Sequence, residues 1–200
     1  MNAEPAFQFT QQQRAVINHA GGALLVASGP GTGKTRVIVE RIAHLVEHHD
    51  AKPNEILALT FSRSAATEMM HRVARRLGER AGAITFSTFH SFSLGLIHQH
   101  HSAFGYPTPP RVITIREQVE LIRRILATTR GPMLHPITLL SKRSFGARII
   151  AEALVHVHER SNHITDSDLH AALESIASEY RNLRRTASLV DHPAMVPEAV

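Results

Sequence analysis

The sequence predicts an α/β protein in which a parallel sheet with flanking helices is followed by an all-helical part. Short apolar runs alternate with stretches of helical periodicity over residues 11–101, which is typical of a parallel sheet covered by helices. A glycine-rich turn connects the first apolar run to the helix after it. The stretch 102–110 is dense in proline, and beyond it apolar residues recur only at helical spacing.

The first part is expected to begin with a short helix over residues 11–20, which Gly21 and Gly22 end. Residues 23–27 form an unbroken apolar run, which suits a strand buried on both faces of a parallel sheet. Periodicity and turn residues predict further strands over 56–61 and 83–86, and helices over 37–48, 64–77 and 90–101.

The second part begins at a domain boundary, which we place at 102–110 because a proline-dense segment cannot continue a helix. The basic run at 181–185 is interpreted as a solvated helix face. The apolar spacing after the boundary predicts helices over 117–128, 145–160 and 166–185.

Composition narrows the classes of protein. Lys and Arg outnumber Asp and Glu by 22 to 17, a net charge of +5, which hints at a polyanionic partner. The absence of cysteine excludes a disulfide scaffold, a thiolate metal site and a cysteine nucleophile. No secretory signal precedes the first helix, and no run approaches the roughly 18 apolar residues of a membrane span. A reducing cytoplasm is the expected location, without a membrane partner.

The glycine-rich turn carries the strongest chemical signal. It matches the pattern G-x-x-x-x-G-K-[ST] except that Ser28 stands at the first glycine. Such a turn directs backbone N–H groups at phosphates, Lys34 supplies a charge for them, and the Thr35 hydroxyl is a Mg²⁺ ligand. The other interpretation is a turn that merely caps a helix. The expected nucleotide-binding residues of the turn are Ser28, Gly29, Pro30, Gly31, Thr32, Gly33, Lys34 and Thr35, with Lys34 and Thr35 as catalytic residues.

A glutamine-rich segment lies shortly before this turn. Gln13, within residues 9–14, is close enough to the turn in the sequence for its amide to reach the base of a nucleotide bound there, as both hydrogen-bond donor and acceptor. Taken alone, the segment is more simply interpreted as a polar helix cap with its first turn.

Two further segments lead to a family. Residues 56–69 and 84–91, together with Gln13, the turn and Arg36, resemble the N-terminal motifs of the UvrD/Rep-type superfamily 1 DNA helicases, in the same order and spacing. The resemblance is specific across residues 9–92 and thinner beyond. It implies a RecA-like P-loop domain interrupted by a helical insertion called domain 1B.

The resemblance also implies roles for single residues. Gln13 resembles the glutamine that reads adenine, and Arg36 the arginine near the base or ribose. Phe61 resembles the aromatic that stacks on a base of single-stranded DNA, whereas without the resemblance core packing is the simpler interpretation of Phe61 and Phe89. The implied contacts to the DNA strand are Thr60, Phe61, Ser62, Arg63, Thr88, His90 and Ser91.

The chain departs from the family pattern in three places. Ser28 replaces a small Ala or Gly, and Arg63-Ser64 stands where Asn-Lys is frequent. Residues 189–195 read Leu-Val-Asp-His-Pro-Ala-Met where many members have Leu-Val-Asp-Phe-Asp-Asp-Leu. The resemblance implies three parts of the chain. Residues 1–104 are expected to be the first half of the ATP-binding domain 1A, residues 105–187 the 1B-like insertion, and residues 188–200 an incomplete return to 1A.

Hydrolysis needs an apolar strand ending in Asp-Glu to hold Mg²⁺ and orient water, and no such segment is present. Asp191 is the one acid after an apolar pair, and Pro193 makes its strand a poor central one. His98, His100 and His101 lack a third ligand and are interpreted as a solvated helix end.

We therefore expect the front portion of an ATP-dependent 3′–5′ DNA helicase or translocase of DNA repair, inactive by itself. Its expected cofactors are ATP and Mg²⁺. Its expected partners are single-stranded DNA, single-strand/duplex junctions and a C-terminal motor domain in the same chain. The alternatives are a nucleotide- and DNA-binding module that does not hydrolyse ATP and, less favoured, a P-loop kinase.

Overall fold

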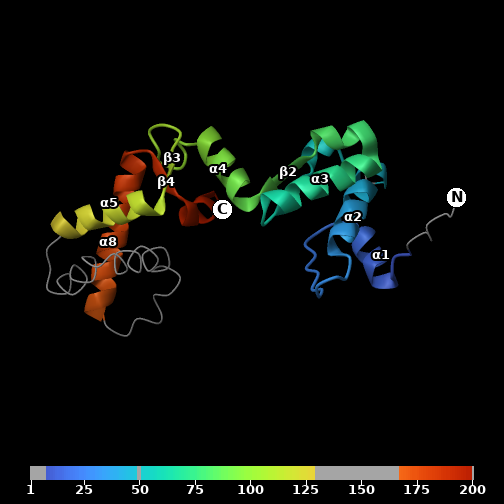
Figure 1. Ribbon diagram of the computed structural model, residues 1–200, viewed down its shortest axis with the longest axis horizontal. Coiled ribbons are helices and arrows are strands. Elements are labelled where there is room, and N and C mark those ends of the chain that lie inside the picture. The colour runs from blue at the N-terminus through green and yellow to red at the C-terminus, as the bar shows by residue number, and fades with distance from the viewer. Residues whose placement is uncertain (1–7, 49–50, 129–166, 200) are drawn as a thin grey trace. The chain divides into compact units, whose positions relative to one another are not determined.

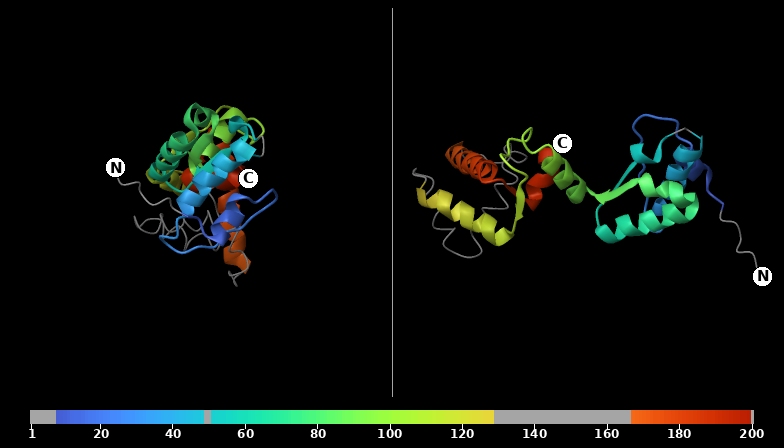
Figure 2. Two further views of the ribbon diagram at one scale, coloured as in Figure 1. Left: turned by 90° about the vertical axis from the view of Figure 1, so that its right-hand side faces the viewer. Right: turned by 90° about the horizontal axis from the view of Figure 1, so that it is seen from above.

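A computed structural model describes residues 8–48, 51–128 and 167–199 of the protein. The chain divides into two compact units, Met1–Phe89 and His90–Val200, each with its own apolar core (Figures 1 and 2). Among the described residues, no helix is long and apolar enough to cross a membrane.

The first unit is built around two parallel strands. Strand β1 (Leu57–Thr60) pairs with β2 (Thr85–Thr88) so that Thr60 lies opposite Thr88 at their carboxyl ends. The helices are α1 (Gln11–Ile17), α2 (Lys34–His48) and α3 (Arg63–Leu77), with short 3₁₀ turns η1 (Pro53–Glu55) and η2 (Gly78–Ala83).

Helix α3 lies beside the strand pair and supplies much of this core (Figure 2). Its apolar residues Met69, Val73 and Leu77 recur every four positions and are all buried, as an amphipathic helix requires. The Ser62 hydroxyl accepts a hydrogen bond from the Ala65 N–H, which caps the first turn, and Gly78 ends the helix with a φ of 62°. These local signals explain why α3 forms within one residue of the predicted helix over 64–77.

The predicted strand over residues 23–27 does not form, and this expectation was wrong. The segment has no regular secondary structure, and its Leu25 side chain is 96% exposed. A strand needs hydrogen-bonding partners on a neighbouring strand. Within the described residues, β1 and β2 pair only with each other, and residues 23–27 add to neither edge of this pair.

The second unit is not all-helical, contrary to the prediction. Strand β3 (Arg111–Ile113) pairs in parallel with β4 (Leu189–Asp191), far away in the sequence. The predicted helix over 145–160 lies outside the described residues. The helices are α4 (Phe89–Gln99), α5 (Ile115–Thr128), α8 (Ser167–Thr186) and α9 (Met195–Ala199), with a 3₁₀ turn η4 (His192–Ala194) before α9.

Helices α5 and α8 pack on each other through one apolar cluster (Figure 1). Its most deeply buried residues include Ile122, Ile125 and Ile176. A second cluster joins Ile97 of α4 to Val190 of β4. Buried apolar contacts therefore hold both ends of this unit's sequence together.

The basic run at 181–185 is not wholly solvated, which corrects the prediction. Arg184 is only 3% exposed and lies between two carboxylates. Its Nη2 donates to Glu198 Oε1 at 2.7 Å, and its Nε lies 3.3 Å from Asp191 Oδ2. Burial opposes its charge, but Asp191 and Glu198 outweigh that effect and raise the pKa of Arg184.

Candidate functional site

The glycine-rich turn forms an exposed loop before α2. Gly31 and Gly33 have φ values of 74° and 83°, in the left-handed region where only glycine is unstrained. The Thr32 hydroxyl donates to the Gly29 carbonyl at 2.9 Å, which closes the loop on itself. Two glycines of the turn therefore stand at positions where other residues would be strained.

Lys34 begins α2 and turns back over the loop. Its ammonium group donates to the carbonyls of Ser28 and Gly29 at 3.3 and 2.5 Å, and its side chain remains accessible to solvent. Thr35 follows in the first turn of the helix. The cation and the N-terminus of a fifteen-residue helix thus meet at one place, which favours an anion.

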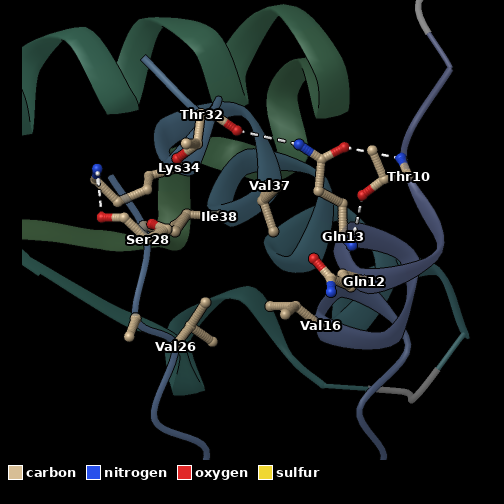
Figure 3. A pocket seen from close by; sticks show the side chains of 11 residues that line it. Thr10, Gln12, Gln13, Val16, Val26, Ser28, Thr32, Lys34, Val37 and Ile38 are labelled. Carbon is tan, nitrogen blue, oxygen red and sulfur yellow. Dashed lines mark hydrogen bonds between the residues drawn. The ribbon is translucent and has the colours of Figure 1, made fainter. Parts of the chain in front are cut away.

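Gln13 connects α1 to the loop. Its Oε1 accepts a hydrogen bond from the Thr10 N–H at 2.9 Å, and its Nε2 donates to the Thr32 carbonyl at 3.1 Å (Figure 3). The Thr10 hydroxyl accepts in turn from the Gln13 N–H at 3.2 Å, completing a capping box. The helix-cap interpretation of this segment is confirmed, and the same side chain also holds the loop.

A cavity of about 540 Å³ lies between α1, the loop and α2. Its volume falls within the range of small-molecule sites. Figure 3 shows Ser28, Thr32 and Lys34 of the loop region on the left and Thr10 and Gln13 on the right, with Val37 between the two groups and Val16 and Val26 below. The cavity is lined by Thr10, Gln12, Gln13, Val16, Val26, Ala27, Ser28, Thr32, Lys34, Val37 and Ile38.

Two arginines of α2 flank this site. The Arg36 guanidinium carbon lies 5.5 Å from the centre of the Phe9 ring, in a cation–π contact. Arg41 donates to three carbonyls at the C-terminal end of α1. Sequence reasoning found Arg36 through the family resemblance but missed Arg41, because nothing local shows which carbonyls it meets.

A second set of predicted residues lies at the carboxyl ends of β1 and β2. Phe61 is 89% exposed and Phe89 47% exposed, so the core-packing interpretation of Phe61 was wrong. The Thr60 hydroxyl donates to the Ser62 carbonyl at 2.9 Å, which fixes the backbone around Phe61. Arg63 is exposed at the start of α3, and Thr88 is buried opposite Thr60.

The comparison with protein families agrees with these motifs. The model of the UvrD/REP helicase N-terminal domain family matches residues 9–199. The chain belongs to this family. The match covers the loop, the exposed aromatic residues and the segment that contains β4.

Named relatives of this UvrD/REP chain include DNA helicase II of Escherichia coli (strain K12), which is 35% identical over 115 residues, 58% of this chain and 16% of the relative. ATP-dependent DNA helicase PcrA of Staphylococcus aureus (strain Mu50 / ATCC 700699) is 36% identical over 126 residues, 63% of this chain and 17% of the relative. ATP-dependent DNA helicase UvrD1 of Mycobacterium leprae (strain TN) is 29% identical over 199 residues, 94% of this chain and 25% of the relative. The chain spans a quarter or less of the length of these relatives.

His90 and Ser91, the last predicted DNA contacts of this UvrD/REP chain, lie in the first turns of α4, and Ser91 is exposed. The His90 ring stacks on the His192 ring with centroids 3.8 Å apart. Burial, followed by the proximity of His192, lowers the pKa of His90. Sequence reasoning missed His192, whose residue type alone gives no sign of a partner in α4.

Asp191 has structural contacts in the second unit. It is 2% exposed, its Oδ2 accepts from the Tyr180 hydroxyl at 2.7 Å, and its Oδ1 accepts from the Ala194 N–H at 2.9 Å. The guanidinium group of Arg184 lies beside this carboxylate and compensates its negative charge. In residues 8–48, 51–128 and 167–199, no three His, Asp or Glu side chains cluster as a metal site would require.

Proposed function

We propose that the loop over residues 28–35 binds the triphosphate of ATP together with Mg²⁺, and that the chain is the N-terminal part of an ATP-dependent 3′–5′ DNA helicase. The observation that supports this most is the arrangement of Lys34, the left-handed glycines and the start of α2 beside an open cavity. The names of the relatives agree with both an ATP-dependent and a DNA-directed activity.

The phosphates take the place of the carbonyls that now hold Lys34. An anion is a stronger partner for an ammonium group than two neutral carbonyl oxygens. The Lys34 side chain therefore turns from Ser28 and Gly29 to the β- and γ-phosphates, while backbone N–H groups of the loop donate from the other side. The Thr35 hydroxyl is the protein ligand for Mg²⁺, which neutralises phosphate charge when bound.

The base occupies the cavity next to Gln13. Its apolar wall of Val16, Val37 and Ile38 accommodates a flat heterocycle, and the amide of Gln13 supplies a donor and an acceptor. Arg36 lies near the base or ribose in this proposal. The residues that hold ATP are those of the loop with Gln13 and Arg36.

The DNA interface begins at the carboxyl edge of β1 and β2. An exposed Phe61 offers a stacking platform for a base, and the hydroxyls and charge of Thr60, Ser62 and Arg63 suit phosphate oxygens. The exposed Ser91, in the second unit, is a separate proposed contact to the strand. We propose that this interface takes single-stranded DNA and its junctions with duplex. The same proposal includes a division of the chain into a RecA-like part at 1–104, a 1B-like insertion at 105–187 and a return to the RecA-like domain at 188–200. It also includes a cytoplasmic location.

We propose further that the 200-residue chain binds ATP without hydrolysing it efficiently. The contacts of Asp191 with Tyr180 and Arg184 favour a structural role for the carboxylate over Mg²⁺ coordination. The alternative of a nucleotide-binding module without turnover rests on the same observation. Measurement of DNA-stimulated phosphate release decides: robust turnover by this chain would show that an acid for Mg²⁺ is present in it.

Lys34→Ala tests the nucleotide site. MgATP at a hundredfold excess over its Kd should stabilise the wild-type chain by about 2.7 kcal/mol, which raises its Tm by several degrees. Lys34→Ala should remove this shift, because the phosphates lose their cation. Lys52→Ala is the matched control, since Lys52 is an exposed lysine of the same unit that lies outside the cavity. A shift that persists in Lys34→Ala contradicts the proposal.

A further inference from the structure

Helix α1, which carries Gln13, is held at both of its ends. At its N-terminal end the Gln13 amide bonds to the Thr32 carbonyl of the loop. At its C-terminal end a single nitrogen of Arg41, Nη1, donates to the carbonyls of Val16, Ile17 and His19 at 2.9, 3.2 and 2.9 Å. Both attachments therefore lead to the element formed by the loop and α2.

The C-terminal attachment has a clear physical basis. The last carbonyls of a helix lack partners within it, and a cation at this end interacts favourably with the helix dipole. Helix α1 has seven residues, too few to be stable by hydrogen bonds of its own. Its position must therefore come from tertiary contacts. Among the described ones, the three partly buried hydrogen bonds from Arg41 are the largest group of polar contacts that a single side chain makes to α1.

Arg41 and Lys34 share one face of α2. They are seven residues apart, which is close to two full turns, so both side chains leave the helix in nearly the same direction. Lys34 reaches the loop and Arg41 reaches the far end of α1, while Val37 between them lines the cavity. One helix face therefore sets both the phosphate side and the base side of the site.

We propose that Arg41 is a positioning residue of the nucleotide site, which holds α1 so that Gln13 stands beside the glycine-rich loop. The inference rests on the proposed function, because it concerns the same cavity. Arg41 touches neither phosphate nor base. Its loss therefore affects the part of the affinity that depends on the base and leaves the part that depends on the phosphates.

Two probes separate these parts: MgATP and magnesium tripolyphosphate, which has phosphates but no base. Isothermal titration of the full 200-residue chain should give a lower Kd for MgATP than for tripolyphosphate. Arg41→Met, which keeps the apolar stem, should raise the Kd of MgATP about tenfold, the order of one lost hydrogen-bonded contact. The Kd of tripolyphosphate should stay unchanged.

Four further variants sharpen the test. Arg41→Lys should recover part of the MgATP affinity, because an ammonium group can still donate to the helix carbonyls. Gln13→Ala should resemble Arg41→Met, and the double variant should be no weaker than either, since both changes remove one coupled contact. Arg75→Met, which removes an exposed arginine of α3, should change neither Kd.

Several results would overturn the inference. Equal loss of affinity for both probes would mean that Arg41 only stabilises the unit, and additive effects with Gln13→Ala would mean that the two act separately. Unchanged binding of MgATP in Arg41→Met, or equal wild-type affinity for the two probes, would also reject it. If Arg41→Met does not fold, Arg41→Gln carries the same test with a weaker donor. Failure of the proposed function looks different, because the wild-type chain then binds neither probe.

Discussion

At the scale of single residues, the side chains that carry the proposed chemistry are exposed or already engaged with backbone groups. Lys34 and Gln13 hold loop carbonyls, and Phe61 points away from the core. Exposed side chains such as Phe61 contribute little to the free energy of unfolding and are available to a ligand. Their substitution should therefore separate function from stability.

Phe61→Ala should weaken binding of single-stranded oligothymidylate while leaving the Tm nearly unchanged. Stacking of one base on an aromatic ring is worth about 1–3 kcal/mol, which corresponds to a Kd roughly 5- to 150-fold higher. Met70→Ala, at a half-exposed apolar position of α3, is the control. Fluorescence anisotropy measures the DNA affinity, and MgATP binding should be the same in all three proteins. A large fall in Tm would instead indicate that Phe61 packs in a core.

The pKa of His90 predicts a pH dependence of stability. Because burial lowers the pKa of His90 below the ordinary value of about 6.5, the unfolded chain binds a proton there more readily than the folded chain. The contribution of His90 to the free energy of unfolding is therefore complete above pH about 6.5 and is lost as the pH falls below it.

His90→Phe should lose less stability than wild type between pH 7.5 and pH 5.5, because it keeps a ring against His192 without a titrating group. His100→Phe, at an exposed position just after α4, is the control for removing a histidine. Urea denaturation at the two pH values measures the difference. Equal losses in wild type and His90→Phe would contradict this assignment.

At the scale of elements, helix caps determine where several helices begin. Helix α5 starts with a capping box in which the Thr114 hydroxyl accepts from the Glu117 N–H and the Glu117 carboxylate accepts from the Thr114 N–H. The ion pair with Arg111 and the hydrogen bonds from Thr114 lower the pKa of Glu117 to about 2. The Glu117 carboxylate is therefore ionised at neutral pH.

Thr114→Val should lower the free energy of unfolding by about 1 kcal/mol, since it removes the cap but keeps a β-branched side chain. Thr128→Val is the matched control, because among the described residues the Thr128 hydroxyl donates to carbonyls of its own helix. Urea denaturation at pH 7 measures both variants. A smaller loss in Thr114→Val than in Thr128→Val would show that the cap contributes nothing.

The elements also show which features a sequence reveals. Helix α3 and the loop at Gly31 were predicted closely because caps, periodicity and glycine placement are local. The strand over 23–27 failed because a strand depends on a partner that the sequence does not specify. Strands β3 and β4 were missed because each has three residues and its partner is far along the chain. The burial of Arg184 was hidden for the same reason, since its carboxylate partners lie in other elements.

At the scale of the whole molecule, the two units have separate cores and different proposed roles. The first unit carries the nucleotide loop, and the second contains a buried polar network that joins α8, β4 and α9. In this network Tyr106 and Tyr180 donate to Glu198 and Asp191, and burial raises the pKa of both phenols, so they remain donors at neutral pH. A change to the network should therefore act on stability and not on the nucleotide site.

Arg184→Met should be the most destabilising of these substitutions. It leaves the carboxylates of Asp191 and Glu198 without their cation in a buried site, which costs about 3–5 kcal/mol when one partner of a buried pair is removed. Arg181→Met, at a more exposed position of α8 whose contact with Glu174 is 3.9 Å long, should cost less than about 1 kcal/mol. Urea denaturation followed by circular dichroism measures both. Below the unfolding transition, Arg184→Met should bind MgATP as wild type does; a weakened MgATP affinity there would show that the nucleotide site depends on the second unit.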